Sequence, residues 1–387
     1  MRKSYSTQLR LDSLPIDQVS LNLDCRDRIV PVLRALQHLY SKPDVVEDIM
    51  SLIRCDVNGK TSTKHGREGM DYWHILVLAG VRLGCDYTYD HLQELSENHI
   101  KLRAIMGIGS WDEDTEFKWR TIRENVCLLK PETIDAISGS IVAEGHQIVP
   151  EAIEKLRADS FVMETNIHYS TESSLIRDGL RKILSMCSEL AVGNSLFGWR
   201  QHQHLWMKVK QLARKIDRIA AKKGPNYLAR MNKPYHELLH KAQQITARAR
   251  QLCADMLLPN ATEDDIFGPH TLQAFIARTE RVMDTARRRI LLGEVVPNSD
   301  KLFSVFEPHT QLYIRGKAAK PIQFGRQVLV FEDSAGFIVH RALMKRTQCD
   351  SQVAVEATKA VQKQFGNRVQ RLSFDRGFHS PENQNQL

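Results

Sequence analysis

Two runs of heptad-spaced apolar residues, separated by a Gly-Pro-Asn turn, constrain the fold of this chain more than any other feature. The first run is Leu205, Val209, Leu212, Ile216 and Ile219, and the second is Leu238, Ala242, Ile245, Ala249, Leu252 and Met256. Spacings of four and three residues place apolar side chains along one seam of a helix. Gly224-Pro225-Asn226 lies between the runs and is typical of a turn. The pattern therefore predicts an antiparallel helical hairpin.

The same hairpin is strongly basic. Residues 201–250 contain twelve lysines and arginines against two acidic residues, whereas the whole chain of 387 residues has a net charge of +8. A polyanion is the natural partner of such a segment, because each neutralised phosphate releases condensed counterions. The alternative is an ordinary solvated helix face. The candidate DNA-binding residues all lie on or directly after the first helix: Lys208, Lys210, Arg214, Lys215, Arg218, Lys222 and Lys223.

Residues 1–150 have the periodicity of helices. Apolar positions predict helices over 27–40, after Pro43 and over 72–83, with a polar loop at 58–69. Asp27 is a candidate cap for the first helix, Gly84 a candidate stop for the third, and Thr88 a candidate cap for the next helix. The helix–Gly84–helix step is compatible with a DNA-reading helix-turn-helix and equally with two packed helices joined by a short turn.

The pattern changes after Pro150. Residues 155–166 are predicted to form a strand, and helices resume from about Ser174 to 292. Strands are predicted again over 302–306, 311–315, 327–333, 337–344 and 368–375, with a helix over 353–365 before the last of them. We therefore expect an α+β fold. It comprises a helical N-terminal domain over 1–150 and a second domain over 151–387, with a helical basic insertion at about 172–300.

Composition excludes several classes of protein. No apolar run reaches the roughly 18 residues that span a bilayer, and no apolar stretch follows the basic start of the chain. The seven cysteines are widely spaced, which favours a reducing compartment over a disulfide framework. No glycine-rich phosphate loop is present. We expect a cytoplasmic protein with no membrane partner.

Two aspartates occupy positions suited to metal chemistry. Asp159 falls within the first predicted strand, and Asp375 falls at the end of the last one. Carboxylates from two strands of one sheet can converge on Mg²⁺, which prefers oxygen ligands. Paired metal ions can activate the attacking oxygen and stabilise the leaving oxygen at a phosphodiester. The alternative is that each aspartate caps a local turn.

Four blocks of the sequence resemble bacterial insertion-sequence DDE transposases, particularly the heterogeneous ISNCY group. The blocks are residues 69–79 with 111–129, residues 157–169, residues 302–310 with 315–317 and 324–328, and residues 374–380. The resemblance implies an RNase H-like catalytic domain in which Asp159 and Asp375 match the first and second metal-binding aspartates. It also implies two Mg²⁺ ions, double-stranded DNA (element ends and target) as partner, and a possible homo-oligomer. DNA-end binding by residues 1–150 is a further possibility.

One feature departs from that family. Its third acid, a glutamate on a helix well downstream of the second aspartate, has no counterpart, since Leu387 lies only twelve residues after Asp375. Glu382 follows Pro381 directly and is expected to be an ordinary helix-start acid. We therefore expect a transposase that lacks the C-terminal part of its catalytic domain and is inactive alone. The alternatives are a non-catalytic DNA-binding remnant and a helical protein-interaction module.

Three other sets of residues have a structural and a functional interpretation. His202 and His204 could bind a metal ion, but no further ligand stands at a suitable spacing, so a surface position is favoured. Glu164, Asn166 and His168 could support the metal ligands, although strand alternation puts them opposite Asp159. Trp206 could stack on bases or, as we favour, pack against the neighbouring helix.

Overall fold

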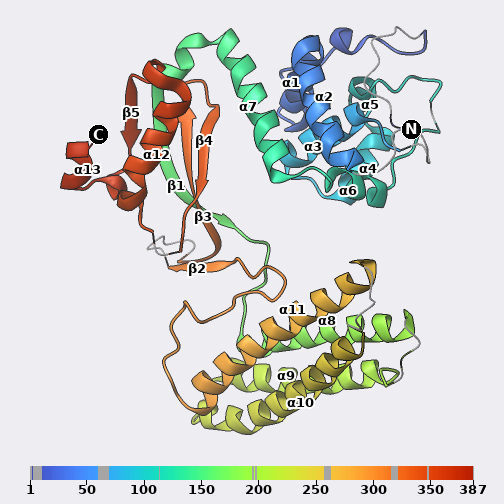
Figure 1. The fold of residues 1–387 in the computed structure, drawn as a ribbon, viewed down its shortest axis with the longest axis vertical. Coiled ribbons are helices and arrows are strands. Elements are labelled where there is room, and N and C mark those ends of the chain that lie inside the picture. The colour runs from blue at the N-terminus through green and yellow to red at the C-terminus, as the bar shows by residue number, and fades with distance from the viewer. Residues whose placement is uncertain are drawn as a thin grey trace. The chain divides into compact units, whose positions relative to one another are not determined.

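The fold combines helices with one mixed sheet, in agreement with the α+β expectation (Figure 1). The computed structural model describes residues 2, 11–59, 69–112, 114–193, 196, 198–256, 263–314, 321–346 and 348–386. The predicted loop at 58–69 and the block at 315–317 therefore lie largely or wholly outside the described residues. The chain divides into two compact units. The first contains residues 1–157, 332–339 and 364–372, and the second contains 158–331, 340–363 and 373–387.

Seven helices with one hydrophobic core make up most of the first unit in its described part. They are α1 (Ile29–Tyr40), α2 (Pro43–Asn58), α3 (Tyr72–Cys85), α4 (Tyr89–Asn98), α5 (Ile100–Met106), α6 (Trp119–Val126) and α7 (Pro131–Ile148). The predicted caps are confirmed, because Asp27 Oδ1 accepts from Ile29 N at 3.1 Å and Thr88 Oγ1 from His91 N at 3.3 Å. The stop predicted at Gly84 is wrong. Helix α3 continues to Cys85 and ends where Asp86 adopts a left-handed φ of 55°.

Polar contacts join α7 to other parts of the first unit. Glu144 is a buried carboxylate whose Oε1 lies 3.1 Å from both His38 Nε2 and Lys42 Nζ, so it links α7 to α1 and the residues that follow it. The hydrogen bond from Lys42 makes the largest contribution to lowering the pKa of Glu144. His146 lies 2.8 Å from Asp333, the last residue of β3 (Ile322–Asp333), and the other oxygen of Asp333 accepts from Ala335 N in the turn that leads to β4 (Ile338–Leu343). These contacts attach α7 to the tip of the β3–β4 hairpin.

The sheet contains β1 (Lys155–Glu164), β2 (Gln311–Ile314), β3 (Ile322–Asp333), β4 (Ile338–Leu343) and β5 (Arg371–Phe374). The order is β2-β3-β1-β5, with β4 also paired to β3, and β2 runs antiparallel to β3 from Gln311↔Gly325 to Ile314↔Ile322. Strands β1 and β3 approach closely at Gly325, where a Cβ atom would lie 2.0 Å from the carbonyl oxygen of Met163. Only glycine fits that position.

The strand predicted over 302–306 is wrong. The Ser304 hydroxyl accepts hydrogen bonds from Phe306 N at 3.2 Å and Glu307 N at 3.0 Å, so the backbone turns instead of extending. Local serine-to-backbone bonds of this kind compete with strand pairing.

Two helices complete the C-terminal part. Helix α12 (Asp350–Phe365) lies in front of the sheet in Figure 1, and Gln327 Nε2 of β3 donates to Asp350 Oδ1 at 2.9 Å. It ends before Gly366, which has a φ of 60°. Helix α13 (Pro381–Gln386) carries Glu382 in its first turn, as predicted.

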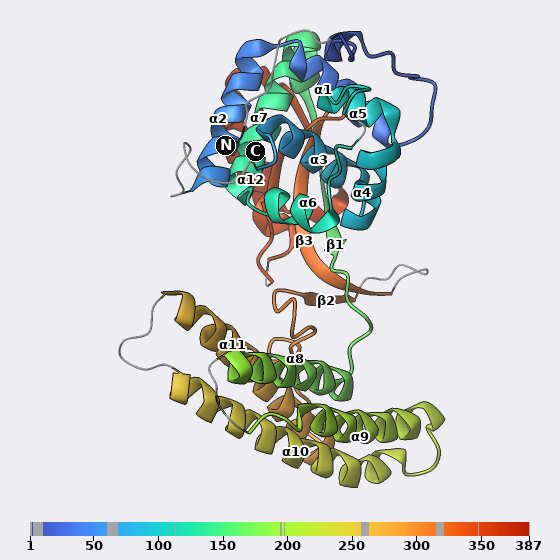
Figure 2. The same cartoon turned by 90° about the vertical axis from the view of Figure 1, so that its right-hand side faces the viewer.

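The insertion forms a four-helix bundle of α8 (Glu172–Gly193), α9 (His202–Lys222), α10 (Tyr227–Met256) and α11 (Glu263–Ala286), which lie side by side in both views (Figures 1 and 2). Helices α9 and α10 are the predicted hairpin, and the seam residues Val209, Ile216 and Leu238 are buried in the bundle core. Helices α8 and α11 pack tightly at Gly179, where a Cβ atom would lie 2.2 Å from the Thr279 hydroxyl.

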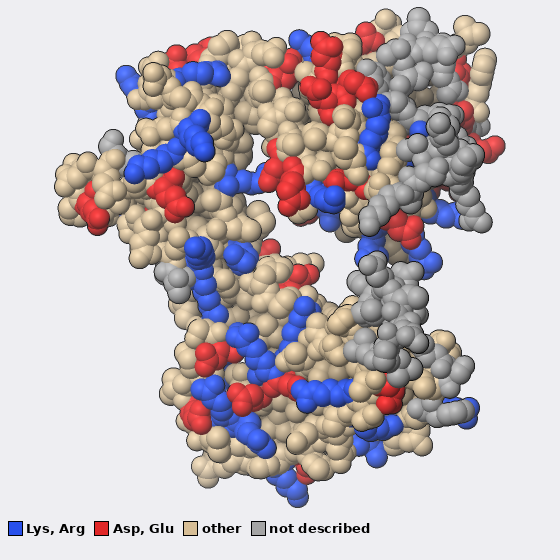
Figure 3. Space-filling view, viewed as in Figure 1, with Lys and Arg blue, Asp and Glu red and all other residues tan. Residues whose placement is uncertain are grey.

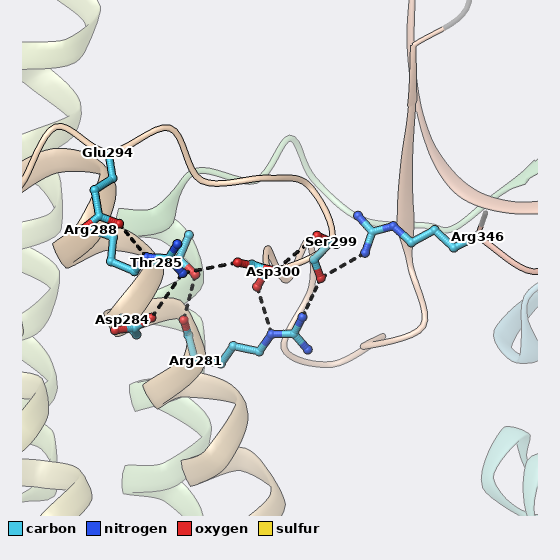
Figure 4. Close-up of polar contacts among 8 residues, drawn as sticks. All are labelled: Arg281, Asp284, Thr285, Arg288, Glu294, Ser299, Asp300 and Arg346. Carbon is cyan, nitrogen blue, oxygen red and sulfur yellow. Dashed lines mark hydrogen bonds and ion pairs between the residues drawn. The ribbon is translucent and has the colours of Figure 1, made fainter.

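Arginines fix the segment that leaves α11 (Figure 4). Arg281 donates to the carbonyl oxygens of Ser299 (2.9 Å) and Asp300 (3.0 Å), and Arg288 contacts the carboxylates of Asp284, Glu294 and Asp300. Arg346, beyond β4, donates to Ser299 O at 3.2 Å. The chain between the bundle and β2 is therefore held by side chains although it forms no helix or strand between Leu292 and Thr310.

Candidate functional site

Asp159 lies in the middle of β1 on its outward face. Exposure alternates along this strand, so that Leu156, Ala158, Ser160 and Val162 are buried while Arg157, Asp159, Phe161 and Met163 are exposed. This alternation follows from the two-residue repeat of a strand. The carboxylate Oδ1 accepts from Ser160 N at 2.7 Å.

Asp375 follows β5 directly and is also exposed. Its Oδ1 accepts from Gly377 N at 2.8 Å, which caps the short 3₁₀ turn Arg376–Phe378. The capping interpretation is therefore correct for one oxygen of Asp375. The same carboxylate retains a second oxygen that makes no bond with the described residues.

The two aspartates are carried by neighbouring strands. Gln327 donates to the buried Ser160 hydroxyl at 3.0 Å, and Phe331, four residues further along β3, points to the same side of the sheet as Gln327. The ring of Phe374 lies 6.0 Å from that of Phe331, which puts Phe374 on this covered side too. Asp159 adjoins Ser160 within β1 and so belongs to the opposite face, and Asp375 follows Phe374 directly at the end of β5. Since β1 and β5 are adjacent, residues 216 positions apart in the chain are carried by neighbouring strands.

Asp159 and Asp375 offer part of the ligand set that a hard divalent cation such as Mg²⁺ requires. Two carboxylates offer oxygen ligands, and Mg²⁺ commonly binds through one or two carboxylates while keeping several waters. Within the described ranges, no group of three or more histidine, cysteine or acidic side chains is close enough to hold a metal ion. A metal site at these aspartates would therefore have two carboxylate ligands, with water molecules completing the coordination shell.

The residues downstream of Asp159 do not join that pair. Glu164 Oε1 accepts from Gln323 Nε2 at 3.2 Å, and His168 lies 3.4 Å from Asp178 of α8. Asn166 and His168 line a separate pocket at the start of the bundle. The structural interpretation holds for Glu164, whereas the pocket was not predicted from the sequence.

Helix α9 presents its basic residues to solvent. Val209 and Ile216 bury the seam, and the exposed Lys208, Lys215 and Lys222, which repeat every seven residues, follow one line along the helix beside that seam. Arg214, Arg218 and Lys223 are exposed as well, and Lys210 is half-buried. None of these seven side chains makes an ion pair with the residues whose positions are described. Figure 3 shows lysine and arginine side chains along the bundle.

The first unit carries a net negative charge, in contrast to the basic α9. Residues 1–157 contain 24 acidic residues against 20 lysines and arginines, whereas residues 158–387 contain 22 against 34. Acidic side chains gather over the helices of this unit in Figure 3. Helix α4, which would be the second helix of a helix-turn-helix, carries Asp90, Glu94 and Glu97 and no lysine or arginine. The charge favours two packed helices over a DNA-reading pair, because phosphates would be repelled.

The remaining candidates have structural surroundings. His202 Nδ1 lies 3.1 Å from Trp199 O, and His204 is exposed on α9 without a second metal ligand in the described part of the chain. Trp206 packs partly buried against the bundle core, as favoured from the sequence.

The structure contains no helix, among those described, that is long and apolar enough to cross a membrane. Comparison with known proteins gives no match to a protein-family model, to a curated protein or to a solved structure.

Proposed function

We propose that this protein is a DNA-binding protein of the insertion-sequence transposase type, with an RNase H-like catalytic domain. In this proposal α9 binds the phosphate backbone, and Asp159 and Asp375 hold the divalent metal ion required for strand cleavage. The observation that carries it is that both aspartates are exposed, one within β1 and one directly after the adjacent strand β5. The element order of a strand, a helical insertion, a hairpin, a helix and a strand supports it as well.

Each part of this proposal follows from the chemistry of the residues. Each carboxylate has one oxygen held by a backbone N–H and one oxygen available to a cation. A bound Mg²⁺ would supply Lewis-acid stabilisation of charge at a phosphodiester. The basic face of α9 would hold the polyanion by neutralising phosphates. The outward orientation of both aspartates leaves them accessible to a substrate as large as duplex DNA.

A second candidate function is DNA binding without cleavage. It is favoured by the finding that, among the described residues, no three histidine, cysteine or acidic side chains lie close enough together to hold a metal ion. Efficient two-metal chemistry needs both ions fixed relative to the attacking and leaving oxygens, and two carboxylates fix them less firmly than three.

The two candidates separate in one experiment. The 387-residue protein is incubated with supercoiled plasmid in Mg²⁺ or Mn²⁺, and Mn²⁺ binding is measured in parallel by electron paramagnetic resonance. Asp159→Asn and Asp375→Asn are expected to weaken Mn²⁺ binding and to leave duplex binding unchanged, with Glu356→Gln on the exposed side of α12 as control. Nicking that both Asp→Asn changes abolish identifies the transposase. DNA binding without nicking identifies the second candidate, and Mn²⁺ binding that neither change affects refutes the metal site.

A further inference from the structure

A pocket of about 350 Å³ opens at the start of the bundle, apart from the aspartate pair. Its walls are the chain that leaves β1 (166–168), the first turns of α8 and the segment 303–307. The volume lies in the range of small-ligand sites. All of these walls belong to the second unit, and Leu175, Leu302 and Val305 anchor two of them in the bundle core.

Three basic side chains line the pocket, and the carboxylate of Asp178, which is also in the lining, lies beside two of them. Asp178 has a side chain only 14% exposed, with one oxygen 3.4 Å from His168 Nε2 and the other 3.5 Å from Arg177 Nε. A single, mostly buried carboxylate thus forms ion-pair contacts with both the imidazole and one guanidinium. Such a carboxylate positions donor groups for a ligand, and it can do so without contacting the ligand itself.

The third side chain, Arg181, is one helical turn beyond Arg177 on α8. Its guanidinium lies 5.7 Å from the centre of the Phe306 ring and makes no ion pair with any residue in the described ranges. A guanidinium stacked on an aromatic ring keeps its N–H donors directed outward in a plane. Two arginines four positions apart on a helix can approach the same anion.

The opposite wall is held in place. The Ser304 hydroxyl accepts from two backbone N–H groups, and Arg278 Nη1 donates to Val305 O at 3.1 Å. Phe306 therefore presents a ring that is 40% exposed from a fixed backbone. Glu307, also in the lining, is half-exposed and lies 3.5 Å from His309 Nδ1, so solvent screens its charge.

From these contacts we propose that the pocket binds one nucleotide, with the phosphate between Arg177 and Arg181 and the base along Phe306. Guanidinium groups match phosphate oxygens with paired hydrogen bonds, and aromatic rings stack on any base. The volume admits a mononucleotide or the 5′-phosphorylated end of a single strand and excludes a duplex. This site is independent of the function proposed above, because it uses neither the aspartate pair nor α9.

Isothermal titration calorimetry of the full chain tests the site, with dAMP, deoxyadenosine and orthophosphate as probes and no divalent metal. We expect dAMP to bind and deoxyadenosine to bind at least about ten-fold more weakly, since the charge-assisted bonds are lost. Arg177→Gln and Arg181→Gln are each expected to weaken dAMP by about ten-fold or more. Lys182→Gln, on the same helix and outside the lining, is the matched control and is expected to leave the affinity unchanged.

Asp178→Asn separates positioning from simple charge. If Asp178 orients Arg177 and His168, the change weakens dAMP binding, whereas plain electrostatics predicts stronger binding once a negative charge is removed. Stronger binding by Asp178→Asn overturns the positioning role of Asp178. Equal losses for Lys182→Gln and Arg181→Gln, or no dAMP binding at millimolar concentration, overturn the nucleotide site. Displacement of dAMP by a 5′-phosphorylated oligonucleotide, and not by its 5′-hydroxyl counterpart, would assign the pocket to a strand end. If neither oligonucleotide displaces dAMP, the pocket is assigned to a free nucleotide.

Discussion

Neutralising the exposed lysine face of α9 should change how DNA binding depends on salt. Lys208, Lys215 and Lys222 are each seven residues apart, so at 1.5 Å per residue they are spaced by about 10 Å along the helix axis. That spacing lets each lysine contact a separate phosphate. Log-log plots of affinity against salt have a slope of about −0.9 per phosphate neutralised in duplex DNA. Loss of three contacts therefore flattens the slope by about 2.7.

The same slope sets the loss of affinity. If the two proteins bind DNA equally at 1 M salt, a slope difference of about 2.7 makes the affinity of the variant up to about 500-fold lower at 0.1 M salt. The triple variant Lys208→Gln, Lys215→Gln and Lys222→Gln keeps helix propensity nearly constant, so circular dichroism should show an unchanged bundle. Fluorescence anisotropy of a labelled duplex between 50 and 300 mM salt gives both quantities.

A matched triple variant controls for net charge. Lys101, Lys359 and Lys363 are exposed lysines outside α9, and their change to glutamine removes the same three charges. We expect this control to leave the slope within about 0.5 of the unmodified protein, because distant surface charges are screened at these salt concentrations. An equal slope for the α9 triple variant and the unmodified protein would show that this face is solvated and does not contact DNA.

Three further outcomes concern stability and reactivity. Gly325→Ala should lower the free energy of unfolding by about 1–3 kcal/mol, because the added methyl group clashes with a carbonyl of β1. Gly139→Ala, in open space within α7, should raise the free energy of unfolding by about 0.5–1 kcal/mol. Urea denaturation measures both changes. Because the pKa of Glu144 is lowered in the folded state, its ionised carboxylate stabilises the fold at pH values above the ordinary pKa of a glutamate. This stabilisation should be lost as the pH falls from that ordinary pKa through the lowered one. Glu144→Gln should remove this part of the pH dependence in thermal melts recorded at a series of pH values. Iodoacetamide at pH 8 should label Cys349 first, because the Ser351 hydroxyl lowers the pKa of that exposed thiol while burial raises the pKa of Cys187 to about 12. Peptide mass spectrometry identifies the labelled cysteines, and modification of Cys187 before Cys349 would contradict the prediction.

Local patterns predicted much of the fold. Heptad spacing predicted the α9–α10 hairpin because a seam such as Val209 and Ile216 can be buried in only one way. Capping at Asp27 and Thr88 was equally local and is confirmed. The strand predicted over 302–306 failed because a single hydroxyl, that of Ser304, turns the backbone, and β-propensity does not include such a bond.

The two candidate sites differ in how much of each could be predicted from the sequence. Two-residue alternation puts Asp159 on the solvent side of its strand, and the alternation of burial in β5 does the same for Asp375, so their orientation could be predicted once the strands were identified. That β1 and β5 are neighbours could not be predicted by periodicity alone, because strand order is set by packing. The nucleotide pocket joins Arg181 to Phe306 across 125 positions, and no local pattern relates such residues.

The insertion of the bundle between two adjacent strands has a consequence for how the chain reaches this fold. Strand β1 and its neighbour β3 meet where Thr165 N donates to Phe324 O, so their pairing closes a loop of about 160 residues. The entropic cost of closing a flexible loop grows with the logarithm of its length, and collapsing most of that loop into a rigid body removes about 1 kcal/mol of it. A bundle with its own core can form from local contacts in advance and bring the two strand ends together. Packing within the bundle therefore affects the formation of the sheet, and changes that loosen the α8–α11 contact at Gly179 would slow the pairing of β1 with β3.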